Sequence, residues 1–398
     1  EQGHYTHTQR QESHCVQIHK YRLLFLLPLL TLFIFTHAQG AGPVPAPPKV
    51  AASGHLLIDF DSGKIISEES ADERLEPASL TKIMTAYVVM RELREGNLKL
   101  TEEVLVSEKA WRTPGSRMFI EVGKKVSVEK LMMGLIVQSG NDASVALAEH
   151  VAGSEESFAG LMNQHAQRLG MDNTHFVNSN GLPAEDHYTT ARDMAAVAAA
   201  TIREFPDYYK WYAVKKFSYN IPNPQYNRNK LLWRDDSVDG LKTGHTEAAG
   251  YCLVASAKRE DMRLISVVMG TKSENARAKV SQSLLNYGFR FFETHRLYGA
   301  GDKLSQVRTW KGDREQVGLG LNRDLFVTIP RKQYKNLKAS MSINPQIIAP
   351  VSKGSTLGKV TVTLNGENVT EVPLIALESV AEGGIWELAR DSALLWLE

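Results

Sequence analysis

Apolar residues along the chain change their spacing several times, and each spacing predicts a different kind of element. Between residues 55 and 70, two apolar runs flank an Asp-Ser-Gly turn at 61–63, which predicts a β-hairpin. A second pair of apolar runs, at 251–257 and 264–269, encloses a polar stretch and predicts another hairpin. Segments with helical spacing lie between and after these runs. The sequence therefore predicts a domain that combines helices with antiparallel strands.

Helical and alternating patterns then occupy separate regions of the chain. Segments with helical spacing and helix-ending residues are found at 79–94, 127–138, 143–151, 155–169, 191–203 and 273–292. From about residue 297 the pattern changes to short alternating runs, which predicts strands at 326–329, 339–343, 360–364 and 369–374. The expected fold class is therefore α+β, with helices around an antiparallel sheet followed by a smaller all-β domain.

The N-terminal residues have the pattern of a secretory signal peptide. Basic residues precede a short apolar core at 23–35, and small residues at positions 36 and 38 follow it. These features are typical of a cleaved signal, and the core is short for a spanning helix; an uncleaved membrane anchor is the alternative. Residues 1–15 fit neither pattern, so we expect translation to start after them, with Val16 as a candidate non-standard start.

Together these patterns divide the chain into five parts. They are an N-terminal extension and signal peptide at 1–38, a linker at 39–54, a mixed helix-and-strand domain at 55–294, a β-rich domain at 295–377 and an amphipathic segment at 378–398. The linker is rich in proline, alanine and glycine, which favours an extended and flexible connection.

Charge and cysteine content narrow the classes of function. The chain has 46 Lys and Arg residues against 45 Asp and Glu, so it lacks the basic excess of a nucleic-acid binder, and no nucleic-acid partner is expected. Cys15 lies in the N-terminal extension, and Cys252 lies in an apolar run where a buried structural thiol is expected. No Cys and His cluster has metal-ligand spacing, so no metal site is predicted.

The first chemical signal is a serine followed three residues later by a lysine, at the start of an apolar helix. Ser79 and Lys82 lie at i and i+3, so one helical face presents both side chains. The residues after Lys82 are almost all apolar, and burial favours the neutral form of a lysine, which can accept a serine proton. Ser127 and Lys130 share this spacing, but Ser127 is predicted to be a helix N-cap.

Two further triplets distinguish the Ser79–Lys82 pair from the Ser127–Lys130 pair. A Ser-Gly-Asn triplet at 139–141 follows an apolar helix, and a Lys-Thr-Gly triplet at 242–244 precedes a strand. The three motifs in this order resemble those of the penicillin-recognising serine acyltransferases, which include the penicillin-binding proteins and the serine β-lactamases. Stretches such as EPASLTKIMTAYVV, SGNDASVALAE and DGLKTGHTEAAGYCLVASA resemble the low-molecular-mass D-alanyl-D-alanine carboxypeptidases over about residues 55–293. The resemblance implies the transpeptidase/β-lactamase-like fold and no cofactor.

The resemblance also implies catalytic roles for four residues. Ser79 attacks the carbonyl between the two terminal D-alanines of a peptidoglycan pentapeptide, with Lys82 as its general base. Ser139 and Lys242 pass the proton to the departing D-alanine. A water molecule then hydrolyses the acyl-enzyme. β-Lactam antibiotics are expected to trap Ser79 because they mimic the D-Ala-D-Ala bond.

A second set of residues is implied in substrate binding. The set is Asn141, Arg228, Thr243, Gly244, His245 and Arg277. Asn141 would hold a substrate amide, and the backbone N–H groups of Ser79 and His245 would form an oxyanion hole. Thr243 and Arg277 would bind the terminal carboxylate, with Arg228 as a further candidate.

Three alternatives use the same fold. A class A β-lactamase carries a Glu-x-x-x-Asn pattern between the second and third motifs, and residues 142–241 contain none. A D,D-endopeptidase would share the nucleophile and differ in the bond it cuts, so an assay has to separate it from a carboxypeptidase. A catalytically silent scaffold protein would not need the complete set of motifs.

The C-terminal segment predicts an amphipathic helix. One side of that helix is expected to carry Ile385, Leu388, Ala389, Ser392, Leu395 and Trp396. In the family that the chain resembles, such a segment lies on the outer face of the cytoplasmic membrane, which implies an exported, periplasmic enzyme. Residues 380–398 contain one basic residue and four acidic ones, so the attraction of this helix to anionic lipid is weak. A helix packed on the β-rich domain is the alternative.

Overall fold

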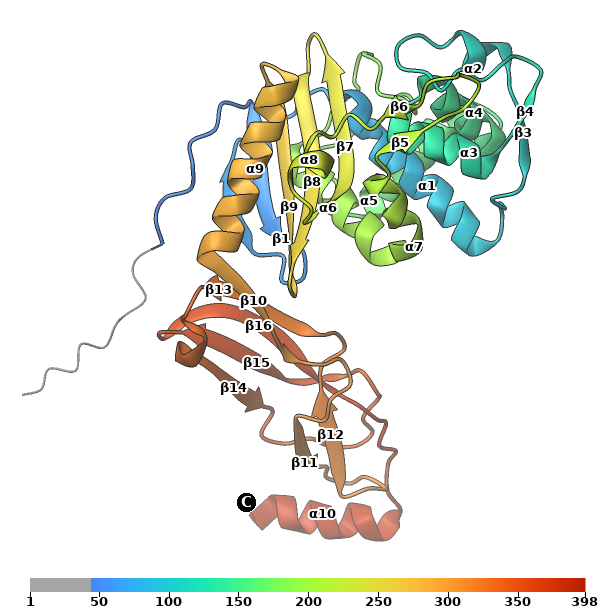
Figure 1. Ribbon diagram of the computed structural model, residues 1–398. Coiled ribbons are helices and arrows are strands. Elements are labelled where there is room, and N and C mark those ends of the chain that lie inside the picture. The colour runs from blue at the N-terminus through green and yellow to red at the C-terminus, as the bar shows by residue number, and fades with distance from the viewer. Residues whose placement is uncertain (1–43, 398) are drawn as a thin grey trace, which may run out of the picture. The chain divides into compact units, whose positions relative to one another are not determined.

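The computed structural model describes residues 44–397, so the predicted signal peptide lies outside the described part of the chain (Figure 1). Its larger sheet has five antiparallel strands in the order β2-β1-β9-β8-β7. The strands are β1 (Gly54–Asp59), β2 (Ile65–Glu69), β7 (Val238–Thr246), β8 (Gly250–Arg259) and β9 (Met262–Thr271).

Both predicted hairpins are confirmed. β1 pairs with β2 across the turn at 61–63, with His55 opposite Glu69, and β8 pairs with β9. β9 also pairs with β1, so the first and last strands of this domain meet at the centre of the sheet. β7 is left at one edge, which is the strand that carries the Lys-Thr-Gly triplet.

Neighbouring side chains of the central strands enter two separate hydrophobic cores. In β1, Leu56 belongs to one core and Leu57 to the other, and Val267 and Val268 of β9 divide in the same way. Successive residues of a strand point to opposite faces, so strands that are apolar at every position need cover on both faces. This sheet is therefore buried on both sides.

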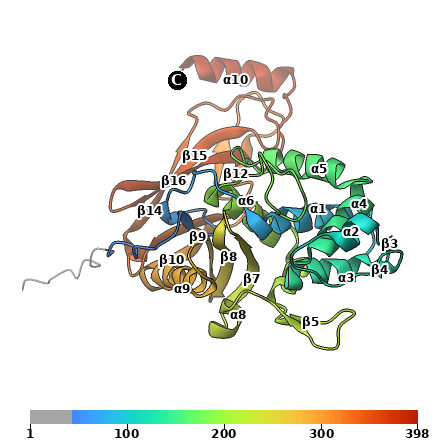
Figure 2. The same cartoon turned by 90° about the horizontal axis from the view of Figure 1, so that it is seen from above.

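Helices provide that cover (Figure 2). α9 (Glu274–Phe291) packs on one face, and α6 (Ala191–Glu204) packs on the other. The other elements between β2 and β7 are η1 (Ala78–Leu80), α1 (Thr81–Glu95), β3 (Glu103–Leu105), α2 (Glu108–Arg112), β4 (Lys125–Ser127), α3 (Val128–Met133), η2 (Gly134–Gln138), α4 (Asn141–Ala152), α5 (Glu155–Arg168), α7 (Pro206–Tyr209), η3 (Lys210–Ala213), β5 (Lys216–Phe217), β6 (Gln225–Tyr226) and α8 (Leu231–Arg234).

The predicted helices are confirmed, with two differences that both fall beside functional motifs. The helix expected from residue 79 begins as the 3₁₀ turn η1, and α1 starts at Thr81. The helix expected over 127–138 divides into α3 and the π-helical segment η2. Ser127 is the N-cap of α3, because its Oγ accepts the N–H of Lys130. The prediction that Ser127 is a helix N-cap is therefore confirmed.

The β-rich part contains a second five-stranded sheet and a two-stranded ribbon. β10 (Phe292–Tyr298) pairs with β13 (Leu325–Pro330), and the larger sheet has the order β11-β12-β16-β15-β14. Its strands are β11 (Ser305–Arg308), β12 (Gln316–Gly320), β14 (Leu337–Ile343), β15 (Thr356–Leu364) and β16 (Glu367–Ala376), with η4 (Tyr334–Asn336) before β14. The four predicted strands are confirmed. β10 was not predicted because it follows α9 without an intervening turn residue.

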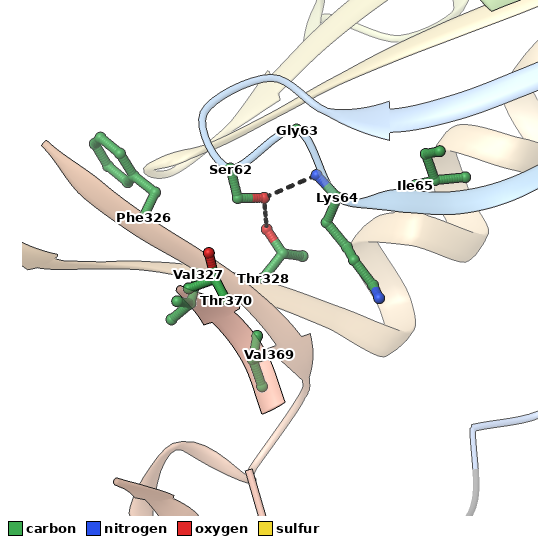
Figure 3. Close-up of a pocket in the computed structure, with 9 residues that line it drawn as sticks. All are labelled: Ser62, Gly63, Lys64, Ile65, Phe326, Val327, Thr328, Val369 and Thr370. Carbon is green, nitrogen blue, oxygen red and sulfur yellow. Dashed lines mark hydrogen bonds between the residues drawn. The ribbon is translucent and has the colours of Figure 1, made fainter. Parts of the chain in front are cut away.

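A closed ring of hydrogen bonds connects the first hairpin with the β10–β13 ribbon, and Figure 3 shows its contact between Ser62 and Thr328. The buried carboxylate of Asp59 accepts the N–H and the hydroxyl of Ser62, both at 2.8 Å, and the Thr294 hydroxyl at 2.7 Å. Thr328 Oγ1 lies 2.6 Å from Ser62 Oγ and 2.8 Å from Thr294 Oγ1. Because its oxygens are satisfied, the buried carboxylate does not penalise folding as an unpaired one would.

The C-terminal helix α10 (Ile385–Leu397) is confirmed as a helix. It is anchored to the β-rich part by Asp391, whose buried carboxylate accepts the backbone N–H of Lys311 at 2.6 Å and pairs with Arg390. Leu388 and Leu395 are half-buried on that same side, whereas the predicted apolar face had grouped them with exposed residues such as Trp396. In residues 44–397, no helix combines the length and the apolar character needed to span a membrane.

Candidate active site

The site is built around η1, the tight turn that carries Ser79. Ala78, which precedes the serine, has a φ of +47°, a left-handed conformation that a non-glycine residue adopts only when its surroundings hold it. Those surroundings are two glycines. A Cβ on Gly244 of β7 would lie 3.1 Å from Pro77 O, and a Cβ on Gly181 would lie 1.9 Å from Ala78 O. The backbones of Gly181 and Gly244 therefore pack directly against the turn that carries Ser79.

Lys82 lies one turn beyond Ser79 and is fully buried. Its Nζ lies 3.1 Å from Ser79 Oγ, 2.7 Å from Asn141 Oδ1 and 2.5 Å from the Asn180 carbonyl oxygen. The two carbonyl-type oxygens can only accept hydrogen bonds, whereas the serine hydroxyl can also donate. A neutral amine has two N–H donors and one lone pair, so this set of partners directs its lone pair at Ser79.

The electrostatics of the pocket favour that neutral state. Burial, and to a lesser extent the positive charge of Arg228, lower the pKa of Lys82 from 10.5 to about 7, against the opposite effects of Asp142 and Glu155. The sequence predicted a buried, neutral lysine from the apolar residues that follow it. The structure adds the second cause, which is a cation far away in the sequence.

The second triplet lies where the π-helical segment η2 ends. Ser139 is buried and has a φ of +62°, which turns the chain sharply into α4. At the start of α4, Asn141 uses both ends of its amide: Oδ1 accepts from Lys82, and Nδ2 donates to Pro114 O at 2.6 Å. The resemblance had implied that Asn141 holds a substrate amide. In this structure Asn141 positions Lys82.

A neighbouring carboxylate fixes the loop opposite this triplet. Asp142 is fully buried, and its two oxygens accept the backbone N–H groups of residues 118, 119 and 120 at 2.9–3.3 Å. This arrangement holds Gly115 and Ser116 beside Ser79. Ser116 was not predicted as a site residue, because a lone serine in a turn carries no pattern that separates it from any other loop serine.

The edge strand β7 and helix α9 provide the opposite wall. Lys242 is buried, and its Nζ donates to the carbonyl of Thr243 at 3.0 Å. Burial lowers the pKa of Lys242 well below its usual value, aided by the positive charges of Lys82, Arg228 and Arg277. A second buried amine of lowered pKa therefore lies next to Thr243, which lines the catalytic cavity.

Arg277 reaches this wall from α9. Its Nη1 donates to the carbonyl of Gly244 at 3.0 Å, and its guanidinium lies 5.5 Å from the Tyr251 ring centroid. The same tyrosine stacks on His245, with 3.9 Å between ring centroids. Arg277 is only 3% exposed, so it is not the solvated surface charge that a helical arginine usually is.

Two adjoining cavities bring the predicted residues together. One, of about 150 Å³, is lined by Ser79, Ser116, Ser139, Arg228, Thr243, Gly244, His245, Tyr251, Glu274 and Arg277. The other, of about 290 Å³, is lined by Ser79, Gly115, Ser116, Asn141, Asn180, Gly181, Leu182, Arg228, His245 and Thr246. Lys82 and Lys242 lie buried beside them. Tyr251, Glu274 and Asn180 are lining residues that the motifs alone did not indicate.

Comparison with known proteins agrees with this geometry. Residues 42–273 match the model of a family described as D-alanyl-D-alanine carboxypeptidase. The chain belongs to this D-alanyl-D-alanine carboxypeptidase family. It is thus a serine hydrolase with D-alanyl-D-alanine carboxypeptidase activity. Residues 292–382 match a second model, described as the C-terminal domain of penicillin-binding protein 5.

Individual relatives extend the match to most of the chain. D-alanyl-D-alanine carboxypeptidase DacC of Escherichia coli (strain K12) is 46% identical over 374 residues, covering 92% of this chain and 93% of that protein. The structure of penicillin-binding protein 5 from Haemophilus influenzae matches with a TM-score of 0.82 at 42% identity, covering 85% of this chain and all of that one. Penicillin-binding protein D2 from Listeria monocytogenes, in its ampicillin-bound form, matches with a TM-score of 0.56 at 27% identity, covering 61% of this chain and all of that one.

The contact between Gly181 and the serine turn gives a first prediction for this carboxypeptidase. We expect Gly181→Ala to reduce acylation by a fluorescent penicillin about 100-fold, because the added Cβ must displace Ala78 O and with it the nucleophile. Gly96→Ala is a matched control, since Gly96 has the same φ of +81° and nothing within 4 Å of an added Cβ. Equal acylation rates for the two variants would show that the contact does not position Ser79.

Proposed function

We propose that the carboxypeptidase acts through an acyl-enzyme on Ser79, formed from a peptidoglycan pentapeptide that ends in D-Ala-D-Ala. The observation that carries this proposal is the buried Lys82 amine, whose Nζ lies 3.1 Å from Ser79 Oγ. Lys82 accepts the hydroxyl proton while Ser79 attacks the carbonyl between the two D-alanines. The backbone N–H groups of Ser79 and His245 stabilise the oxyanion.

Departure of the terminal D-alanine requires a proton on its amine nitrogen. Ser139 and Lys242 line or adjoin the smaller cavity next to Ser79, and they are the candidates to deliver that proton. The acyl group that stays on Ser79 is then hydrolysed by water, with Lys82 again accepting a proton. A general base with a pKa near the working pH, as Lys82 has, is favourable for general acid–base catalysis.

Recognition of the free C-terminus distinguishes a carboxypeptidase from an endopeptidase. The cavity that contains Ser79 also contains two guanidinium groups, Arg228 and Arg277, and the hydroxyl of Thr243. A carboxylate bound to these donors is the terminal group of the D-alanine to be released. Glu274 in the same cavity is neutralised by Lys230 at 2.9 Å, so the lining keeps a positive balance.

The experiment that tests this proposal compares two peptides. We expect free D-alanine to be released from a pentapeptide ending in D-Ala-D-Ala, and release to fall about 100-fold or more when the terminal carboxylate is replaced by a carboxamide. Equal rates for the two peptides, or cleavage of a cross-linked dimer without release of D-alanine, would favour the endopeptidase.

The proposal extends to inhibition by β-lactams and to the cellular location of the enzyme. A β-lactam presents a strained amide next to a carboxylate, so it fits the same nucleophile and the same cationic lining, and Ser79 is its expected point of attachment. The substrate is part of the cell wall, and the N-terminal pattern is that of a secretory signal, so we propose an exported, periplasmic enzyme.

The C-terminal helix supports a peripheral attachment to the membrane surface. With about 100° between successive residues, an arc of about 120° of α10 contains its four most exposed large apolar residues and two exposed alanines, while Leu394, 38% exposed, lies outside it. The residues in the arc are Ile385, Trp386, Ala389, Ala393, Trp396 and Leu397. Both tryptophans are more than 80% exposed, and Asp391 anchors the opposite side. Tryptophan at a membrane surface binds by partitioning into the interface, which does not require basic residues.

This attachment gives a second prediction. We expect the protein to sediment with phosphatidylcholine vesicles, the double variant Trp386→Ala/Trp396→Ala to lose about 90% of that binding, and a rise in salt from about 0.1 to about 0.5 M to leave it unchanged. Trp111→Ala/Trp233→Ala is the matched control, because those two tryptophans are partly exposed elsewhere in the chain. Binding that survives loss of Trp386 and Trp396 excludes the proposed attachment.

A further inference from the structure

A polar groove lies between α8 and α9, near the active site. Its lining residues are Arg234, Asp235, Asp236, Arg259, Asn275, Lys279, Gln282, Ser283 and Asn286, and its volume is about 750 Å³. The short helix α8 and the long helix α9 lie side by side there (Figure 2), joined by a hydrogen bond of 3.2 Å from Arg234 to Asn275. Asn275 directly follows Glu274, which lines the catalytic cavity. The groove and the catalytic cavity are therefore lined by successive residues at the N-terminal end of α9.

The side chains of α9 that line the groove form a straight stripe. Asn275, Lys279, Gln282 and Asn286 are spaced by four, three and four residues, so they lie on one face of the helix. At 1.5 Å per residue, the stripe extends about 17 Å away from the catalytic cavity. This length suits an extended chain better than a compact ligand.

A hydrogen-bond network holds the floor of the groove in place. Asp235 Oδ2 accepts from Arg259 at 2.8 Å and from Gln282 at 2.7 Å. Arg259 and Gln282 also donate to Asn286 Oδ1, at 3.0 and 3.3 Å. The floor side chains are thus ordered before a ligand arrives, which reduces the entropy lost on binding.

The chemistry of the lining indicates the class of ligand. Amides, a hydroxyl, guanidinium groups and carboxylates present donors and acceptors together, and the lining contains no apolar side chain. Three cationic residues face two anionic ones, so the groove has no strong preference for a polyanion such as nucleic acid. Sugar hydroxyl and N-acetyl groups also donate and accept at once, and they match such a surface.

We propose that this groove binds the amino-sugar glycan strand that carries the stem peptide. The proposal rests on the proposed function, in which the pentapeptide of peptidoglycan enters the adjoining catalytic cavity. The groove would align the polymer so that a stem peptide reaches Ser79. Free pentapeptide would gain nothing from it.

The test separates glycan binding from catalysis by using peptide-free glycan strands as the probe. We expect these strands to bind the wild-type protein and the Ser79→Ala variant equally, and the variant Lys279→Ala/Asn286→Ala to bind them about tenfold more weakly. Lys130→Ala/Gln167→Ala is the matched control, since it removes one exposed amine and one exposed amide outside the groove. Melting curves of all variants check that each is folded.

The kinetic counterpart uses two substrates. Lys279→Ala/Asn286→Ala should raise KM for glycan-linked pentapeptide about tenfold and leave release of D-alanine from free pentapeptide unchanged. Absence of binding by peptide-free glycan, or equal binding by wild type and groove variant, overturns the glycan proposal even if D-alanine is released. A wild-type protein that releases no D-alanine from free pentapeptide refutes the proposed function instead, whatever the glycan measurement shows.

Discussion

Replacement of Ser79 by alanine is expected to abolish both D-alanine release and covalent labelling by a fluorescent penicillin. The rate of release should fall by at least about 10⁴-fold, the order of loss found when a catalytic serine is removed. The physical reason is that no other hydroxyl in the cavity has a buried amine aimed at it: Lys82 Nζ contacts Ser79 Oγ, not Ser139 or Ser116.

The control for this variant is a serine with the same spacing to a lysine. Ser127→Ala removes the N-cap of α3, so it should cost about 1 kcal/mol of stability and leave labelling intact. Labelling that persists in Ser79→Ala at the wild-type rate would contradict the acyl-enzyme. Labelling that is lost in both variants, with normal melting curves, would contradict the assignment of Ser79 as the distinctive residue.

The second large effect is a loss of acylation in acid. Lys82 has a pKa of about 7 in the folded protein, and only its neutral form can accept the Ser79 proton. Below pH 7 the neutral fraction falls about tenfold per pH unit, so acylation by a fluorescent penicillin at pH 5 should be about 100-fold slower than at pH 8. Above about pH 8 the amine is almost fully neutral, so this group causes no further rise. Lys82→Met, which keeps the bulk of the side chain but has no amine, should lose the reaction.

Two variants test whether Lys82 causes the fall in acylation rate at low pH, which we call the acid limb of the pH profile. Arg228→Gln removes a positive charge that lowers the pKa of Lys82, so the limb should move to higher pH. Lys242→Gln should slow the reaction and keep the limb near pH 7, since Lys242 is a separate amine. If the limb disappears in Lys242→Gln, or lies near pH 10 in the wild-type protein, Lys82 is not the base that titrates.

Much of the fold was predictable because most of its elements are locally consistent. The hairpins at 55–70 and 251–269 have apolar runs around short polar turns, and α5 and α9 have serine N-caps and apolar stripes. Prediction was poorest where the chain departs from regular geometry. The 3₁₀ turn at Ser79, the π-helical segment before Ser139 and the strand β10 follow from contacts with distant residues, which local sequence patterns do not record.

The candidate site shows the same division. The resemblance implied Ser79, Lys82, Ser139 and Lys242 from motifs; in the structure Ser79 and Ser139 line one cavity, and Lys82 and Lys242 are buried next to it. Ser116, Tyr251 and Glu274 carry no motif, so their presence in the lining came only from the structure. α10 is an intermediate case, because its helical character was predictable, whereas its exposed face depends on how Asp391 docks on the β-rich part.

The sequence by itself determined which groups could react. It placed a serine and a lysine one helical turn apart, it followed the lysine with apolar residues, and it supplied the two partner motifs in order. Spacing along a chain is sufficient for this, because it fixes which side chains share one helical face. Only the tertiary structure decided the protonation state of Lys82. Its neutral form depends first on complete burial in the folded chain and then on the nearby positive charge of Arg228, while Asn141 and Asn180 accept from its N–H groups and orient it; these residues come from segments far apart in the sequence. Hydrogen bonds and desolvation act over a few ångströms in space, so they depend on how the folded chain brings those segments together.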